Sequence, residues 1–148
     1  NSNLLPYASS RPKRNKDLNI ALIGDASSMI NPMSGEGIFY GMEAGYLLAK
    51  NTHEIIHSSK LSDGIDLYEK EFSKRFRKHY LSCALARLIL QSPFMTKRLL
   101  RVASNDQDTI DFVVELLFDE AYLTLKEVFK IAYKFIIPTK LLVLSSKN

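Results

Sequence analysis

The first third of the chain has the hydrophobic pattern of a strand followed by a loop and a helix. Residues 18–23 form a short apolar run rich in branched side chains, and the run stops abruptly at Gly24. This pattern predicts a strand buried on both faces, as in a parallel sheet covered by helices. After a loop rich in Ser, Asn, Pro and Gly, residues 37–57 are predicted to be helical, with one face marked by Ile38, Met42, Tyr46 and Ala49.

The chain after residue 60 has helical periodicity throughout. Ser62 and Asp63 can cap a helix. Its apolar stripe repeats every three or four positions, at Ile65, Tyr68, Phe72, Phe76 and Tyr80. Pro93 is expected to end or kink this helix, because proline lacks the amide that continues the hydrogen-bond ladder.

Three shorter helices complete the predicted tail. They cover residues 94–103, a segment from Asn105 or Asp106 to residue 118, and residues 124–138. Thr124 and Glu127 match a capping box at the start of the last helix. The predicted fold class is therefore an α/β fragment, in which a strand–loop–helix unit precedes an all-α tail without strands of its own.

Length and residue usage limit the kinds of site that the chain can hold. Its 148 residues suit one compact domain or a large piece of a bigger one. It begins at Asn1 without an initiator Met or a leader, and we expect a piece of a longer protein. Cys83 is the only cysteine, which excludes an intrachain disulfide, and we expect it to pack in the core. No metal-ligand pattern includes the histidines, which are His53, His57 and His79.

Charge is segregated along the sequence. Residues 65–101 carry nine basic and three acidic side chains, for a net +6, whereas residues 102–120 carry six acids and no base, for −6. Such blocks most simply indicate helices that lie near one another. A basic surface for nucleic acid or anionic lipid is the alternative. No nucleic-acid-binding module is found in the sequence, and we expect no nucleic-acid partner.

The candidate chemistry is concentrated in residues 21–50. If a strand ends at Gly24, Asp25 places a carboxylate at the carboxyl end of that strand, where open α/β folds bind ligands. The loop then brings Gly35, Glu36 and Gly37 to the start of a helix, whose first amides have no partner within the helix. Those amides and the positive end of the helix dipole suit a group that is or becomes negative.

Residues 24–45 resemble the second FAD fingerprint of flavoproteins built like aromatic hydroxylases, and they are most similar to the geranylgeranyl reductase family. The pattern of that family is similar to G-D-A-A-x-x-x-x-P-x-x-G-E-G-I-x-x-A-x-x-x-G. The residues expected to bind the cofactor on this resemblance are Gly24, Asp25, Ala26, Pro32, Gly35, Glu36, Gly37 and Ile38. The departures, Ser27 and Gly41, exchange one small residue for another. The resemblance implies that residues 1–60 are the C-terminal part of a Rossmann-like FAD-binding domain and that residues 61–148 form a helical C-terminal region.

The same resemblance implies a role for individual residues. Asp25 would hydrogen-bond a ribityl hydroxyl of FAD, and Pro32 would lie along the isoalloxazine. The amides of Gly37 and Ile38 would face N1 and the C2 carbonyl, where a helix N-terminus stabilises the negative charge of reduced flavin. Glu36 is open to two interpretations. It can orient substrate or relay a proton, or it can stabilise the helix start as any carboxylate does there.

The implied activity is that of an FAD-dependent oxidoreductase that reduces isoprenoid carbon–carbon double bonds, by hydride transfer from flavin N5 and protonation of the neighbouring carbon. An isoprenoid or other hydrophobic small molecule is the expected substrate, and NAD(P)H or a ferredoxin-like protein is the expected electron donor. No catalytic residue is assigned. The G-x-G-x-x-G turn for the ADP half of FAD is not found in the chain, so we expect the chain alone to be inactive and to bind FAD weakly.

Two alternative hypotheses stay open. One is a flavin monooxygenase or halogenase of the same architecture. The other is a non-enzymatic, helical, membrane-associated module. Lys126, Lys130 and Lys134 form a line at i, i+4 and i+8 in a helix that is otherwise rich in apolar residues. Such a helix can cover a core or lie in a membrane interface with its lysines toward anionic headgroups. We expect a cytoplasmic location, with peripheral contact to the inner face of the membrane if this helix binds lipid.

Overall fold

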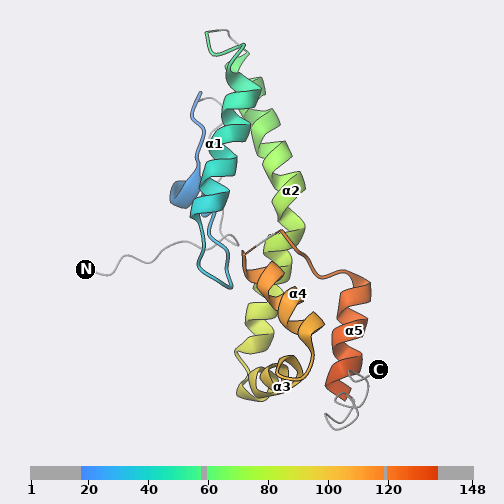
Figure 1. The fold of residues 1–148 in the computed structure, drawn as a ribbon. Helices are drawn as coiled ribbons and strands as arrows, with labels where there is room; N and C mark the ends of the chain where they lie inside the picture. The colour runs from blue at the N-terminus through green and yellow to red at the C-terminus, as the bar shows by residue number, and fades with distance from the viewer. Residues whose placement is uncertain (1–17, 58–59, 119, 137–148) are drawn as a thin grey trace, which may run out of the picture.

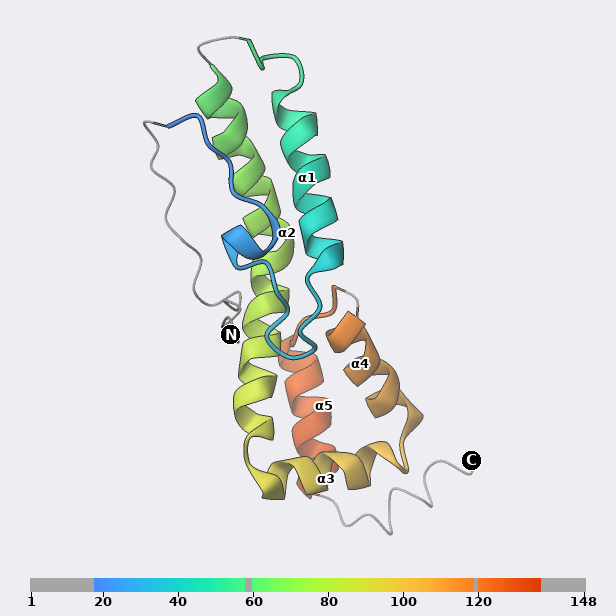
Figure 2. The same ribbon diagram turned by 90° about the vertical axis from the view of Figure 1, so that its left-hand side faces the viewer.

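A computed structural model of the chain describes residues 18–57, 60–118 and 120–136. Within these residues the chain forms a short 3₁₀-helix, η1, and five α-helices (Figure 1). Their bounds are Gly24–Ser27 for η1, Ile38–Thr52 for α1, Leu61–Leu90 for α2, Pro93–Ala103 for α3, Gln107–Phe118 for α4 and Leu125–Ile136 for α5. Helices α1 and α2 form a long antiparallel hairpin, and α3, α4 and α5 gather around the far end of α2 (Figures 1 and 2).

The predicted strand over residues 18–23 is wrong, and with it the prediction of an α/β sheet. The segment is extended, with Ile23 at φ −135° and ψ 162°, and it runs beside α2 (Figure 2). The described residues contain no strand, so no ladder partner exists for it there. It is instead held by a hydrogen bond from the Tyr68 hydroxyl of α2 to the Leu22 carbonyl, 2.9 Å long. Leu18, Ile20 and Ile23 are exposed rather than buried on both faces.

The core lies between α1 and α2 and consists mainly of aromatic rings. The stripe predicted for α2 is confirmed, because all five of its members are buried. The rings of Phe72 and Phe76 lie 4.7 Å apart, and Tyr40 of α1 meets Phe76 edge to face at 5.3 Å. Such pairs contribute roughly 0.5–1.5 kcal/mol beyond the area that they bury. The stripe predicted for α1 faces outward: Ile38, Met42 and Tyr46 are exposed.

The helix limits of the tail follow the predicted signals, with one correction. Pro93 is the first residue of α3, and α2 ends three residues earlier. Asp106 caps α4, because its carboxylate accepts a hydrogen bond of 2.9 Å from the Thr109 amide. Thr124 accepts one of 3.3 Å from the Glu127 amide at the start of α5. Helix α2 begins before the predicted caps, which lie inside its first turn. The predicted end of the last helix at residue 138 lies outside the described residues.

The acidic block of the tail pairs with α5 as well as with α2. Lys130 donates to Asp108 at 2.8 Å, and Lys134 is paired with Asp106. The basic block contributes Arg75, which is paired with Glu120 and with Glu43 of α1. The basic and acidic blocks are therefore near one another, as predicted. Helix α5 supplies two further basic partners for the acidic block, Lys130 and Lys134, which the prediction did not include.

Among the described residues, no helix combines the length and the apolarity that crossing a membrane requires. The domain division predicted at residue 60 falls in the connection between α1 and α2. It stays a prediction.

Two helical glycines predict opposite effects of the same substitution. A Cβ on Gly64 would lie 2.5 Å from the Asn51 carbonyl oxygen and 2.9 Å from Ile55 Cδ1, so the start of α2 requires glycine where it crosses the end of α1. A Cβ on Gly45 of α1 would meet nothing within 4 Å. We expect Gly64→Ala to lower the free energy of unfolding by about 1–3 kcal/mol. Gly45→Ala is expected to raise it by about 0.5–1 kcal/mol.

Urea unfolding measures both changes as shifts of the midpoint at constant m-value. A Gly64→Ala protein as stable as the wild type would contradict the close packing of α1 and α2 at this point.

Candidate functional site

The candidate site is built on the loop that connects the extended segment to α1. Gly24 begins η1 with φ +58°, and Gly35 lies just before α1 with φ +76°. These are left-handed conformations, which glycine adopts without steric cost. Ser28 closes η1 in the same region with φ 54°, and its amide donates to the Asp25 carbonyl at 3.0 Å. The two glycines therefore allow the chain to turn at both ends of the loop.

Residues from the two ends of this loop come together at the start of α1. A Cβ on Gly37 would lie 3.3 Å from the Met29 carbonyl oxygen and 3.8 Å from Oδ1 of Asp25. One turn further along α1, a Cβ on Gly41 would lie 3.6 Å from Cα of Gly24. The structure thus places Gly24, Asp25 and Gly37 in one place, although they are separated in sequence by the loop. Gly37 is needed there because the backbone of the loop passes directly beside it.

The first amides of α1 are used unequally. Oε1 of Glu36 accepts a hydrogen bond of 2.8 Å from the Phe39 amide, so this carboxylate caps the helix. No acceptor for the amides of Gly37 and Ile38 is found among the described residues. The observed contact of Glu36 agrees with its structural interpretation. Two donors at the positive end of the helix dipole stay available to an anionic or carbonyl group.

The other candidate residues differ in accessibility. Asp25 and Ala26 are exposed on η1, and Gly35 is exposed before α1. No ion pair of Asp25 is found in the described part of the chain. Ile38 is exposed at the first position of α1, beside the free amides. Pro32 is buried in the turn of residues 32–34, so its ring is not on the accessible side of the loop.

Asn31 organises the loop and was missed from the sequence. Its Oδ1 accepts hydrogen bonds from the amides of Met33 at 2.8 Å and Ser34 at 3.2 Å. The backbone amide of Asn31 donates to the Glu36 carbonyl at 2.7 Å, and its backbone carbonyl accepts from the Gly35 amide at 2.9 Å. An Asn side chain that accepts from the amides two and three residues later is a known turn signal.

The side-chain amide of Asn31 connects the loop to a buried polar cluster. Nδ2 lies 3.3 Å from the Tyr40 hydroxyl and 3.2 Å from Nε2 of His79, and these two atoms lie 2.7 Å apart. Nδ1 of His79 lies 2.6 Å from the Ala121 carbonyl oxygen, which can only accept. In the neutral ring the proton is therefore on Nδ1, and Tyr40 donates to Nε2. Burial raises the pKa of Tyr40 to about 12, so the phenol keeps its proton.

Cys83 adjoins the same cluster and behaves as a core residue, as predicted. Its thiol is fully buried, lies 3.5 Å from Nε2 of His79 and donates to the Leu116 carbonyl at 3.3 Å. Burial raises the pKa of the thiol to about 11, which leaves little thiolate at neutral pH. Despite the neighbouring histidine, the pair has the character of a structural contact and not of a nucleophile with its base.

A metal site and a cavity are the other kinds of site to consider in the described residues. No group of three or more His, Cys, Asp or Glu side chains there has an arrangement that could hold a metal ion. A cavity of about 310 Å³ lies between α4 and α5, away from the loop of the candidate site, and is lined mainly by charged side chains. The loop and the start of α1 are therefore the place where sequence and geometry agree best.

The role of Asn31 predicts a specific loss of stability. Replacing Asn31 by Ala leaves the amides of Met33 and Ser34 without their acceptor and takes the Nδ2 donor away from the buried Tyr40–His79 pair, and we expect the free energy of unfolding to fall by about 2 kcal/mol. Asn105→Ala is the matched control, because Asn105 is exposed and is expected to change stability by less than about 0.5 kcal/mol. Urea unfolding measures both. Equal losses in the two proteins would contradict the organising role of Asn31.

Comparison with known proteins finds partial relatives. A digeranylgeranylglycerophospholipid reductase of Thermoplasma acidophilum is 27% identical over 107 residues, which cover 72% of this chain and 24% of that protein. The chloroplastic geranylgeranyl diphosphate reductase of Nicotiana tabacum is 30% identical over 110 residues, which cover 74% of this chain and 23% of that protein. The 6-hydroxy-3-succinoylpyridine 3-monooxygenase HspB of Pseudomonas putida is 32% identical over 57 residues, which cover 38% of this chain and 14% of that protein.

No protein-family model and no solved structure matches the chain. The chain spans less than a quarter of the length of each of these relatives. Their names denote reductases and a monooxygenase, which supports the coarse class of oxidoreductase. The predicted resemblance is thereby confirmed: the chain is similar to part of geranylgeranyl reductases and of related oxidoreductases.

Proposed function

We propose that this chain is part of an FAD-dependent oxidoreductase that reduces carbon–carbon double bonds of an isoprenoid, and that the loop before α1 binds the ribityl and isoalloxazine parts of the flavin. When bound, the flavin supplies the redox chemistry, and this chain binds and orients it. Two of the known relatives carry prenyl reductase names, and they match this chain over more residues than the monooxygenase does.

The observation that carries the proposal is the pair of amides at the start of α1 for which the described residues offer no acceptor. The donors of Gly37 and Ile38 belong to a helix N-terminus, which stabilises negative charge by about 0.3–1 kcal/mol and by more when partly buried. Asp25 lies beside them, with its carboxylate exposed. Donors at one position and a carboxylate acceptor at the next suit a ligand that has a carbonyl edge and a hydroxylated arm, as flavin does.

The other residues of the loop fit the flavin as a frame around these groups. Gly37 lets the backbone of the loop pass directly beside the start of α1, and Glu36 holds the first turn of α1 by its bond to the Phe39 amide. Ile38 offers an exposed apolar side chain beside the donors. Because Pro32 is buried, the proposal gives it a place in the turn and no contact with the flavin.

The second candidate function is a flavin monooxygenase, which the relative from Pseudomonas putida favours. Aromatic hydroxylases resemble G-D-A-A-H and G-x-G-x-N in this region, whereas this chain has Ser28 and Phe39 at the last position of each pattern. Those two departures favour the reductase.

The proposed site predicts which variants lose flavin. In the complete protein that contains this chain, we expect Asp25→Asn to weaken FAD binding by roughly tenfold, because a neutral amide oxygen accepts a weaker hydrogen bond than a carboxylate does. Ile38→Pro removes one free amide at a helix position that tolerates proline, and Ile38→Ala keeps that amide. We expect Ile38→Pro alone of these two to make the flavin potential more negative.

Flavin absorbance after purification and redox titration measure these effects, with Asp63→Asn as a control on the exposed start of α2. A flavoprotein whose binding and potential are unchanged in Asp25→Asn and Ile38→Pro would contradict the site while leaving the enzyme class intact.

The activity itself is tested by product mass. The complete protein, supplied with reduced flavin and a polyprenyl lipid without oxygen, is expected to yield a product that gains two hydrogen atoms for each reduced double bond. A parallel reaction in air distinguishes the second candidate, since a monooxygenase adds an oxygen atom there and is inactive without it. Oxygen gain in air together with no reduction in its absence would contradict the reductase.

A further inference from the structure

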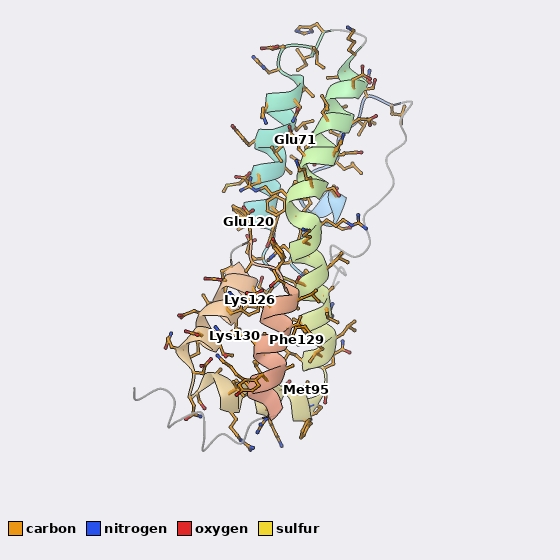
Figure 3. The ribbon with its side chains drawn as sticks, turned by 90° about the vertical axis from the view of Figure 1, so that its right-hand side faces the viewer. Glu71, Met95, Glu120, Lys126, Phe129 and Lys130 are labelled. Atoms are coloured by element: carbon orange, nitrogen blue, oxygen red, sulfur yellow. The ribbon has the colours of Figure 1, made fainter. Side chains whose placement is uncertain are left out.

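Helix α5 presents several large apolar side chains that the other described residues leave exposed. Leu125, Phe129 and Tyr133 recur at the i, i+4 and i+8 spacing of one helix side, and they are 78%, 71% and 66% exposed. Val128 is also exposed. We call these four side chains the outer apolar face of α5. Figure 3 looks onto the outer side of this helix, with Phe129 labelled to the right of Lys126 and Lys130 and Met95 of α3 below.

The opposite side of α5 faces α4 and carries two lysines that are paired with acids at that helix. Lys134 exposes only 12% of its side chain and is paired with Asp106, the residue that caps α4. Lys130 is paired with Asp108 at 2.8 Å. Acids gather on this inner side, because the cavity between α4 and α5 is lined by Asp108, Asp111, Glu115 and Glu127. Ion pairs to α4 therefore set the rotation of the helix and leave its apolar side outside.

This orientation is the reverse of that expected for a helix that covers a core. A surface helix buries its apolar stripe and exposes its charges, whereas α5 half-buries a lysine and exposes large apolar side chains, two of them aromatic rings. Monomeric proteins rarely present contiguous apolar patches of this kind without a partner. Within the described residues the outer apolar face packs on no core, although core packing was one of the two interpretations that the sequence left open for this helix.

We propose that the outer apolar face of α5 docks on the surface of an anionic lipid bilayer, with the helix lying in the plane of the interface. Lys126 is exposed at the edge of the face and has no ion pair among the described residues, whereas Lys130 and Lys134 are already paired with acids of the chain. Exposed basic residues beside aromatic and aliphatic side chains are the composition of interfacial helices. Helix α3, which packs against α5, exposes further residues of the same two kinds, namely Phe94, Lys97, Leu100 and Arg101.

Charge argues against a second copy of the chain as the occupant. If two outer apolar faces met about a two-fold axis, Lys126 of each copy would approach the lysines of the other, which is unfavourable in a partly buried interface. An anionic surface instead attracts the same lysines. The outer apolar face shares no residue with the proposed flavin site, so either proposal can fail without the other.

The chain contains no tryptophan, which allows a single fluorescent reporter to be placed on the face. In the full chain, Phe129→Trp keeps an aromatic side chain there, and Tyr46→Trp is the matched control at an exposed position of α1, far from α5 (Figure 1). We expect the emission of the Phe129→Trp protein to shift to the blue with vesicles of phosphatidylcholine containing phosphatidylglycerol, and to change little with phosphatidylcholine alone. The emission of the Tyr46→Trp protein is expected to stay unchanged with both.

Vesicle flotation then separates the apolar from the ionic contribution. Phe129→Glu is expected to weaken partition by tenfold or more, because an aromatic side chain that would insert into the bilayer is replaced by a charge. Lys126→Gln is expected to weaken it roughly fivefold, the effect of one lysine near an anionic surface. Tyr46→Glu and Lys70→Gln, at exposed positions of α1 and α2, are the matched controls. Far-UV circular dichroism checks that each variant keeps its helices.

Three results would overturn the proposal. They are absence of a blue shift at position 129 with anionic vesicles, equal partition of wild type and Phe129→Glu, and equal binding to neutral and anionic vesicles. If gel filtration instead shows an oligomer that Phe129→Glu dissociates, and no vesicle binding is found, the face is a protein interface and the lipid surface is not its partner.

Discussion

A hydrogen-bonded junction at Asn31 connects the loop before α1 to the packed helices α1 and α2 and to the entry of α5. Its carbonyl oxygen, Oδ1, fixes the turn of residues 32–34, and its Nδ2 reaches the Tyr40–His79 pair between α1 and α2. His79 continues the chain of contacts to the Ala121 carbonyl, at the entry to α5. Each of these groups is costly to bury alone, so the cluster is stable only when all its members are present. Because Asn31 belongs to this cluster and also accepts from two loop amides, the cluster fixes the conformation of the loop at its centre.

The fixed conformation of the loop determines which backbone amides stay available as donors at the start of α1. Asn31 takes the Glu36 carbonyl as an acceptor, and this contact places the Glu36 side chain where it caps the Phe39 amide. The amides of Gly37 and Ile38 precede the capped position. They point away from the helix, where the protein offers them no partner among the described residues. A site with free donors on a fixed backbone costs no reorganisation when an anionic group arrives, which is the usual advantage of a preorganised loop.

Helix positions were predictable because their signals are local. Pro93, Asp106 and Thr124 act through their own backbone or through an amide three residues away, and each marks a helix start where expected. The glycine-rich loop was recognisable for the same reason. The strand was not, because a strand exists only through hydrogen bonds to a neighbouring segment. The sequence of an apolar run such as residues 18–23 does not show whether a neighbouring segment is present to pair with it. Asn31 was missed because its partners, such as His79, are distant in sequence.

The rotation of a helix about its own axis also lies beyond local pattern. Both α1 and α5 have an apolar stripe in sequence, and in both the stripe faces outward. In α1 the buried side is the one that carries Tyr40, because its ring packs against Phe76 of α2 and its hydroxyl bonds to His79 of α2. In α5 it is chosen by the pairs of Lys130 and Lys134 with α4. Periodicity therefore shows that a helix has two different sides, and specific partners on a neighbouring helix determine which side is buried.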